Sequence, residues 1–350
     1  MTKTTAGRFF EDFRVGETLV HPTPRTITSG DVALYQGLYG SRFAVQSSAP
    51  FAEALGYRAA PVDDLIVFHI VFGKSVPDVS INAVANLGYA DCRFLRPVYV
   101  GDTLSAASEV IGLRENSNGK TGVVYVCTTG RDQAGAEVLR FARWVMVNKR
   151  DAASAAPDAV VPDLPNAVAL DGTALAVPEF AGRAYDCSLA GSSHRAGDYQ
   201  PGEKIDHVDG MTVEEAEHQI ATRLYQNTAK VHFDGHRQAS SRFGKRLIYG
   251  GVVISMARAL SFNGLANAFH IAAINGGRHV APLFAGDTVY AWSEVLDVQP
   301  LTGRSDVAGI RLRTIATKNH PCTAFPDPSG EDAAAKAVIL DFDYWTVMPA

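Results

Sequence analysis

The chain repeats itself at a fixed spacing, and this internal repeat constrains its fold more than any other feature. The matched landmarks lie 185 or 186 residues apart: Gly16-Glu17 with Gly202-Glu203, His21 with His207, Leu38-Tyr39 with Leu224-Tyr225, Gly101-Asp102-Thr103 with Gly286-Asp287-Thr288, and Arg93 with Arg278. Agreement of several separate landmarks on one offset indicates duplication of a single folding unit. The sequence therefore predicts two similar domains in tandem.

The repeat divides the 350 residues into two domains and a connector. A chain of this length also exceeds the size at which a single hydrophobic core stops growing. The first copy covers residues 1–149 and the second covers residues 183–350. Residues 150–182 between them are rich in Ala, Pro and Asp without a lasting amphipathic period, which is typical of an extended linker. Because Val and Leu recur in this linker, we do not expect it to be disordered.

Both copies carry the same order of predicted elements. A short strand (18–21 in the first copy) precedes a helix that begins near Ser29-Gly30-Asp31, where a small polar residue can cap it. An apolar stretch long enough for a buried helix follows, at 65–72 and at 252–260. The remaining segments alternate apolar and polar residues around turns: 92–96, 103–111, 122–129, 138–147, 288–298, 308–316 and 337–347.

Such alternation predicts antiparallel strands with one buried face. One central helix wrapped by an antiparallel sheet is the hot-dog arrangement, and here it occurs twice. The predicted fold class is therefore α+β, a tandem or double hot-dog.

Composition and spacing exclude several function classes. A net charge of −5 and a pI near 6.1 argue against the clustered positive charge of a nucleic-acid-binding protein. No apolar run is long enough to cross a membrane, and the first residues lack the pattern of a secretory signal. The cysteines show no zinc-binding spacing, and no phosphate-binding glycine motif occurs. We expect a cytoplasmic protein that can form a homodimer and that binds no metal and no nucleotide cofactor.

One stretch of the second copy carries a recognisable motif. Residues 224–232 read Leu-Tyr-Gln-Asn-Thr-Ala-Lys-Val-His and lead, through Phe243-Gly244, to Gly250-Gly251 before the apolar helix. This stretch resembles the signature of the MaoC-like, or R-specific, enoyl-CoA hydratases. In that signature an Asp is followed five residues later by a His, and a Gly-containing turn then enters the central helix.

The two copies match this signature unequally. The family His falls on His232, but the family Asp falls on Asn227, and the first copy holds Ser41 and Gln46 at these positions. Neither Ser41 nor Gln46 can take up a proton near neutral pH, so the first copy lacks a group for acid/base catalysis. Asn227 in the second copy cannot take up a proton either. The resemblance implies that this degenerate half shapes the acyl pocket while the second half carries the catalytic group.

Two further segments resemble one subgroup of these hydratases. Pro162-Asp163-Leu164-Pro165 in the linker and the opening stretch 7–13 resemble the mesaconyl-CoA hydratases, also called β-methylmalyl-CoA dehydratases. The resemblance implies cofactor-free, reversible hydration of an acyl-CoA substrate, mesaconyl-CoA giving β-methylmalyl-CoA. Three alternatives stay open: a hydratase for another acyl chain, a hot-dog thioesterase, and a non-catalytic acyl-CoA-binding protein.

Hydration of an unsaturated thioester needs a base for water, an acid for the α-carbon and donors for the thioester oxygen. His232 can activate water, whereas Asn227 can orient water but cannot be the acid. Asp234 would replace the missing carboxylate only if 231–234 were extended, and capping is its favoured role. The resemblance implies that Gly251 donates its N–H to the thioester oxygen at the helix N-terminus, with Gly250 and Tyr225 in contact with substrate.

A mesaconyl group ends in a carboxylate, which an arginine can bind through two parallel hydrogen bonds. Arg278 and Arg143 are the candidates, with Arg93 behind them, and no spacing argument selects one. His21 and His207 recur in both copies, so we expect the fold rather than catalysis to explain them.

Overall fold

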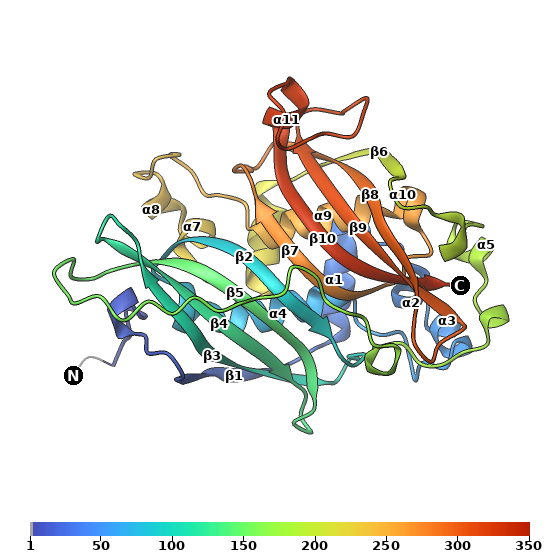
Figure 1. Cartoon of the computed structure of the whole chain (residues 1–350), viewed down its shortest axis with the longest axis horizontal. Helices are drawn as coiled ribbons and strands as arrows, with labels where there is room; N and C mark the ends of the chain where they lie inside the picture. The colour runs from blue at the N-terminus through green and yellow to red at the C-terminus, as the bar shows by residue number, and fades with distance from the viewer. Residues whose placement is uncertain (1–2) are drawn as a thin grey trace.

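The computed structural model describes residues 3–350 and contains one ten-stranded antiparallel sheet with helices on its inner face (Figure 1). The strand order is β1-β3-β4-β5-β2-β7-β10-β9-β8-β6, so each copy contributes five neighbouring strands. The copies join where β2 (Ala83–Phe94) pairs with β7 (His270–His279), with Cys92 opposite Ile274. This α+β double hot-dog is the fold class that the sequence predicted.

The strands predicted from alternation are confirmed, with one difference at the centre of the sheet. The other strands are β1 (Thr18–Thr26), β3 (Thr103–Glu115), β4 (Thr121–Arg131), β5 (Glu137–Asn148), β6 (Lys204–Thr212), β8 (Thr288–Pro300), β9 (Val307–Lys318) and β10 (Val338–Pro349). The predicted strand 92–96 overlaps only the last residues of β2, and β7 was not predicted. In β7 six consecutive residues from His270 are buried, so apolar and polar residues do not alternate there.

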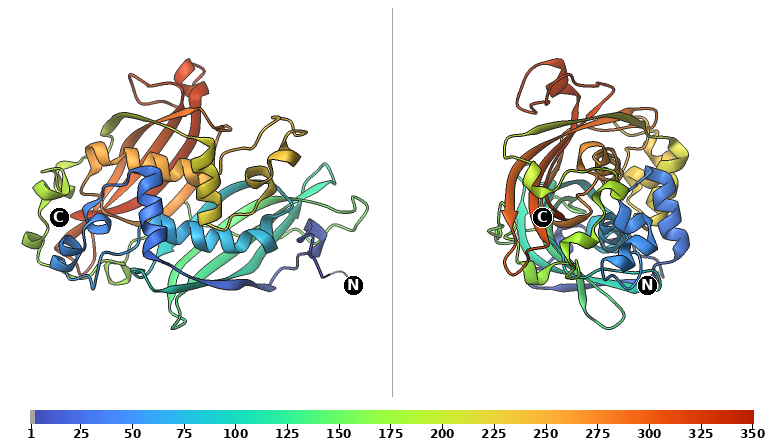
Figure 2. Two further views of the ribbon diagram at one scale, coloured as in Figure 1. Left: turned by 180° about the vertical axis from the view of Figure 1, so that it is seen from behind. Right: turned by 90° about the vertical axis from the view of Figure 1, so that its right-hand side faces the viewer.

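The two predicted buried helices are confirmed as α4 (Asp64–Ser75) and α9 (Gly250–Leu260). Every residue of α4 after its first is buried, as is every residue of α9 after its first. A helix that is apolar on nearly all sides is stable only inside a core. Figure 2 shows both helices against the concave face of the sheet, one within each half.

Equivalent residues of the two copies meet between these helices. The hydroxyl of Tyr225 donates to the hydroxyl of Tyr39 at 3.0 Å, and these residues are 186 apart in the chain. His69 Nε2 lies 2.9 Å from Ser255 Oγ, again across 186 residues. Because each of these pairs joins equivalent positions of the two copies, the halves are related by an approximate twofold axis.

The repeated histidines have matching structural partners. His21 Nε2 lies 2.7 Å from Ser108 Oγ, and His207 Nε2 lies 2.8 Å from Ser293 Oγ. Both imidazoles are buried. The shared pairing of a first strand with the next strand of its half explains why both copies retain a histidine there.

Short helices surround the central pair. The predicted helix at residue 29 is α1 (Ser29–Tyr39), where Thr28 and Asp31 cap each other's backbone N–H groups. The other α-helices are α2 (Ala44–Ser47), α3 (Ala49–Ala54), α5 (Cys187–Ala190), α6 (Glu215–Leu224), α7 (Lys230–Phe233), α8 (Gly235–Gln238), α10 (Phe262–Leu265) and α11 (Ala333–Ala337). A π-helical turn, η2 (Val76–Ser80), follows α4.

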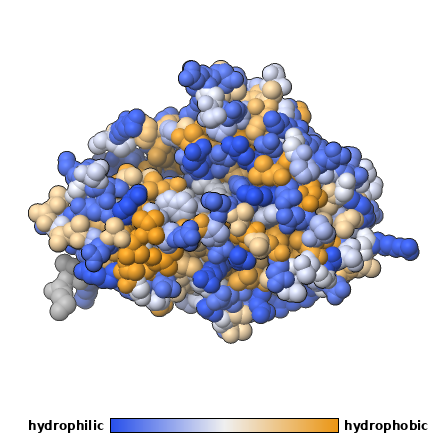
Figure 3. All heavy atoms as spheres, viewed as in Figure 1, coloured by the Kyte–Doolittle hydropathy of each residue, from blue (hydrophilic) through white to orange (hydrophobic). Residues whose placement is uncertain are grey.

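The segment predicted as a linker runs across the outer face of the sheet (Figure 1). Val160 pairs with Leu113 of β3, and the Val168 N–H donates to Asn275 Oδ1 at 2.8 Å. On this face hydrophobic side chains lie in small groups between hydrophilic ones (Figure 3). Within residues 3–350, no helix is long and apolar enough to span a membrane.

Candidate active site

His232 lies on α7, a single turn held from both sides. The side-chain amide of Gln219, on α6, donates to the His232 carbonyl at 2.9 Å. The Leu247 N–H donates to the Val231 carbonyl at 3.1 Å. Because α6 and the segment at Leu247 fix the backbone of His232, its imidazole has a defined position beside Tyr249, the N-cap residue of α9.

The hydrogen bond of the His232 ring determines which nitrogen can act as a base. Nδ1 lies 2.9 Å from the Leu247 carbonyl, which can only accept, so Nδ1 carries the proton and donates. In the neutral ring the lone pair is then on Nε2, which bonds to no other described residue. Burial lowers the pKa of His232 to about 4, against the raising effect of the Leu247 hydrogen bond. The ring is therefore neutral at physiological pH with a basic nitrogen available.

Asn227 follows α6 and is only 1% exposed. The Ala229 N–H donates to its Oδ1 at 3.2 Å, which directs the amide NH₂ group the other way. That NH₂ group donates to no other residue in the described part of the chain. Gln226, just before it, has a φ of 56°, a left-handed conformation that is uncommon outside glycine and concentrates at functional sites.

The N-terminus of α9 faces the same region. Tyr249 is its N-cap residue, and its carbonyl accepts the Val252 N–H, whereas the N–H groups of Gly250 and Gly251 have no acceptor among the described residues. A Cβ at Gly250 would overlap the ring of His279, and a Cβ at Gly251 would overlap Tyr249 and His69. A side chain at either position would have to displace these rings, so glycine lets the start of α9 pack closely against them.

Tyr249 lies at the centre of a group of residues that sequence reasoning missed. Its ring centroid is 5.5 Å from that of His232 and 5.7 Å from those of His69 and Phe72. Its backbone N–H donates to His218 Nε2 at 3.0 Å. No motif marks these residues, because α4, α6 and the α9 entry come together only in the folded chain.

Burial keeps the surrounding histidines neutral as well. It lowers the pKa of His69 and of His218 to about 3, and that of His279 to about 4. The site is therefore a weakly polar enclosure of neutral imidazoles next to the α9 N-terminus.

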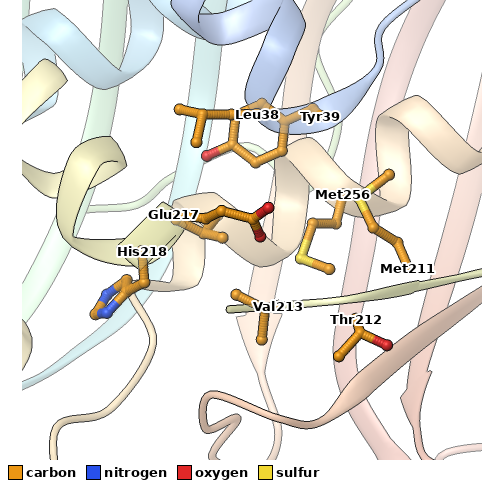
Figure 4. Close-up of a pocket in the computed structure, with 9 residues that line it drawn as sticks. Leu38, Tyr39, Met211, Thr212, Val213, Glu217, His218 and Met256 are labelled. Atoms are coloured by element: carbon orange, nitrogen blue, oxygen red, sulfur yellow. The ribbon is translucent and has the colours of Figure 1, made fainter. Parts of the chain in front are cut away.

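A small pocket lies behind α6. Its walls are Leu38, Tyr39, Met211, Thr212, Val213, Glu217, His218, Val252 and Met256. Figure 4 shows the ring of His218 directed away from Tyr39 and Met256. The same ring receives the Tyr249 N–H and its centroid lies 6.2 Å from that of His232, so His218 is common to this pocket and to the candidate site.

The predicted site residue Arg278 lies elsewhere, as does Asp234, which was considered as a replacement for the family Asp. Asp234 is exposed and caps α8 by accepting the Arg237 N–H at 3.0 Å, and α7 is helical rather than extended. The idea that Asp234 replaces the family Asp is therefore wrong, and its capping role is confirmed. Arg278 has a side chain 66% exposed and pairs with Asp341 at 3.4 Å on the outer face of β7. The structure does not bring Arg278 together with His232.

Tyr225 and Arg143 are both buried beside the site. The Tyr225 hydroxyl donates to Tyr39, so the Tyr225 ring rather than its hydroxyl adjoins Tyr249, at 6.3 Å. Arg143 projects from β5 of the first copy toward Phe72, with its guanidinium 4.4 Å from the ring centroid.

The equivalent place in the first copy has different chemistry. Gln46 Nε2 donates to the Phe269 carbonyl at 2.7 Å, where the second copy has His232. Asp64 stands where the second copy has Gly250, and its carboxylate accepts the Ile271 N–H. An amide and a carboxylate that already bond to protein groups replace the imidazole and the open helix terminus.

Solved structures define the class of protein. A MaoC domain protein dehydratase from Chloroflexus aurantiacus matches with a TM-score of 0.96 at 60% identity, over 100% of this chain and 99% of that one. A Mycobacterium tuberculosis protein with a double hotdog fold matches with a TM-score of 0.75 at 26% identity, over 98% and 99% of the two chains. The fold is that of a MaoC-like double hot-dog protein.

Sequence comparison then gives the family. The model of the mesaconyl-CoA hydratase family matches residues 2–334. A β-methylmalyl-CoA dehydratase from Chloroflexus aurantiacus is 60% identical over 99% of this chain and 98% of its own length. A mesaconyl-CoA hydratase from Cereibacter sphaeroides is 57% identical over 99% of both chains. The chain belongs to the mesaconyl-CoA hydratase family.

Proposed function

We propose that the protein is a hydro-lyase that interconverts mesaconyl-CoA and water with β-methylmalyl-CoA at one site, centred on His232. The observation that carries this proposal is the His232 ring, which donates from Nδ1 to Leu247 and leaves Nε2 free as a base. The names of two relatives at 60% and 57% identity support the same substrate.

A single histidine can perform both proton transfers. Nε2 of His232 takes a proton from water, and the water oxygen bonds to the β-carbon of the enoyl group. The electrons of the double bond move toward the thioester, giving an enolate oxygen. The protonated Nε2 then returns its proton to the α-carbon, so one molecule of water is added in total. A low pKa suits this second step, because the imidazolium is then a strong acid.

Two neighbours complete the proposed mechanism. The Gly251 N–H, at the start of α9, would stabilise the enolate oxygen through a hydrogen bond and the helix dipole. The NH₂ group of Asn227 would hold the attacking water or the substrate. Asn227 takes no part in proton transfer, which is why one histidine must act as base and then as acid.

The proposal is tested by incubating the purified protein with mesaconyl-CoA and, separately, with crotonyl-CoA. We expect the absorbance of the enoyl-thioester to fall without release of free thiol, and to fall faster with mesaconyl-CoA. Thiol release would instead identify a thioesterase. Binding of either thioester with no chemical change would identify a binding protein.

The acid limb of the pH profile follows from the His232 pKa. The ring is an active base only when neutral, so kcat/KM should stay level as pH falls through 6.5, the ordinary histidine value, and halve near pH 4. Circular dichroism at each pH would confirm that the protein stays folded. An acid limb centred near pH 6.5 would show that burial does not lower the pKa of His232.

Asn227 should matter as a hydrogen-bond donor. Asn227→Ala is expected to lower kcat about a hundredfold, the usual effect of removing one positioned donor. The Asn227→Asp side chain can still accept the Ala229 N–H, but it can donate a hydrogen bond to water or substrate only when its carboxyl group is protonated. Its activity relative to wild type should therefore rise as pH is lowered, measured by initial rates. A pH-independent ratio would mean that Asn227 acts through packing alone.

We also propose that the enzyme uses acyl-CoA without a resident cofactor, acts in the cytoplasm, binds neither nucleic acid nor membrane, and can form a homodimer. The negative net charge supports the absence of a nucleic-acid partner. Light scattering of the purified protein would establish whether it is a monomer or a dimer.

A further inference from the structure

Arg143 is a fully buried cation with unused hydrogen-bonding capacity. It lies in β5 and is 0% exposed. One of its terminal nitrogens donates to Ser75 Oγ at 2.8 Å, and Ser80 Oγ lies at the limit of hydrogen bonding, 3.5 Å away. Its Nε is buried without a partner among the described residues. A buried guanidinium is strongly destabilising unless an anion neutralises it.

No carboxylate of the described chain performs this role. Burial lowers the pKa of Arg143 to about 10, and the groups that raise it are Tyr89 and Tyr249 rather than any Asp or Glu. Asp78 in the adjoining η2 turn is engaged with His21 at 2.8 Å. Arg143 is therefore charged at neutral pH and lacks a protein counter-ion.

Contacts connect Arg143 to the His232 site. Its guanidinium stacks on Phe72, whose ring centroid is 5.7 Å from that of Tyr249. The Tyr249 ring in turn lies 5.5 Å from that of His232. The Tyr249 hydroxyl and His279 Nε2 are both buried without a hydrogen-bond partner in the described residues. Unpartnered polar groups from both copies thus lie near Tyr249 and His232.

We propose that Arg143 and the Tyr249 hydroxyl bind the free carboxylate of a dicarboxylic acyl-CoA, and so make the site specific for such substrates. The inference rests on the proposed hydratase function. A guanidinium binds a carboxylate through two parallel hydrogen bonds, and the neutral tyrosine adds a third donor. The partner missing from the protein is then supplied by the substrate.

The chemistry of the substrate agrees with this position. In mesaconyl-CoA the free carboxylate is attached to the β-carbon, which is the carbon that receives water. A group that binds the carboxylate must therefore lie within one or two side chains of the catalytic base, as Tyr249 does. A neighbouring cation also offsets the negative charge that would otherwise repel the approaching oxygen.

Kinetics of Arg143→Met with two substrates test the proposal. We expect kcat/KM for mesaconyl-CoA to fall about a hundredfold, the effect of truncating one partner of a buried ion pair, while kcat/KM for crotonyl-CoA changes less than about threefold. Tyr249→Phe, which keeps the ring, should lower the mesaconyl-CoA value about tenfold with little change for crotonyl-CoA. Arg140→Met, on the exposed side of the same strand, should leave both values unchanged.

A binding measurement separates this proposal from the proposed function. Calorimetry should show that wild type binds succinyl-CoA at least tenfold more tightly than butyryl-CoA, and that Arg143→Met abolishes the preference. If wild type hydrates nothing but keeps this Arg143-dependent preference, the proposed function fails and the carboxylate site stands. Equal losses on both thioesters in soluble, folded Arg143→Met and Tyr249→Phe proteins would overturn the carboxylate site.

Discussion

His232→Ala is expected to lower kcat for mesaconyl-CoA hydration roughly a thousandfold with only a small change in KM. The reason is that, in the proposed mechanism, His232 makes both proton transfers, since Asn227 stands where the family has Asp. Steady-state rates, followed through the enoyl-thioester absorbance, measure the effect.

His236→Ala provides the matched control. His236 lies four residues further on, in α8, and is exposed. It should retain wild-type kcat and KM. If His232→Ala kept more than about a tenth of the wild-type kcat, another group would have to be the base and the assignment of His232 would fail.

Gly73→Ala is expected to destabilise the protein by about 3 kcal/mol or to prevent folding, at the upper end of the usual effect of overpacking. Gly73 is in α4 of the first copy, and a Cβ there would overlap the backbone carbonyl of Tyr225 in the second. Backbone cannot move aside as a flexible side chain can. The midpoint of urea unfolding measures the change.

Gly37→Ala is the corresponding control, because Gly37 lies in α1 and a Cβ added there would meet no other atom within 4 Å. In an exposed helix, Ala in place of Gly should stabilise by about 0.5–1 kcal/mol. Equal unfolding midpoints for the two variants would show that the halves do not contact each other closely at Gly73. Residual folded Gly73→Ala protein should also lose activity, since the same contact adjoins Asn227.

The duplication could be predicted from the sequence because both copies keep landmarks at turns and strand ends. The strands at the join could not be predicted in full. In β7, six consecutive residues from His270 are buried, and the strand lacks the period-two pattern that marks a half-exposed strand. The close contact of α4 with the Tyr225 segment likewise follows from packing between copies, which no local pattern encodes.

Part of the candidate site could be proposed from the sequence. His232 and Gly250-Gly251 came from one continuous motif, and the structure brings them into one region around Tyr249. Arg143 could not be distinguished from Arg278 by spacing, because the difference depends on which face of the sheet each residue occupies. His218 and Tyr249 had no sequence signal, since their hydrogen bond joins α6 to the entry of α9.

Hydration by His232 is tested most directly by the mass of the product formed from mesaconyl-CoA in water labelled with heavy oxygen. We expect an intact CoA thioester that gains one molecule of labelled water in the acyl group with wild type and gains none with His232→Ala. Labelled free mesaconic acid together with free CoA, or an equal gain of water in both proteins, would contradict it.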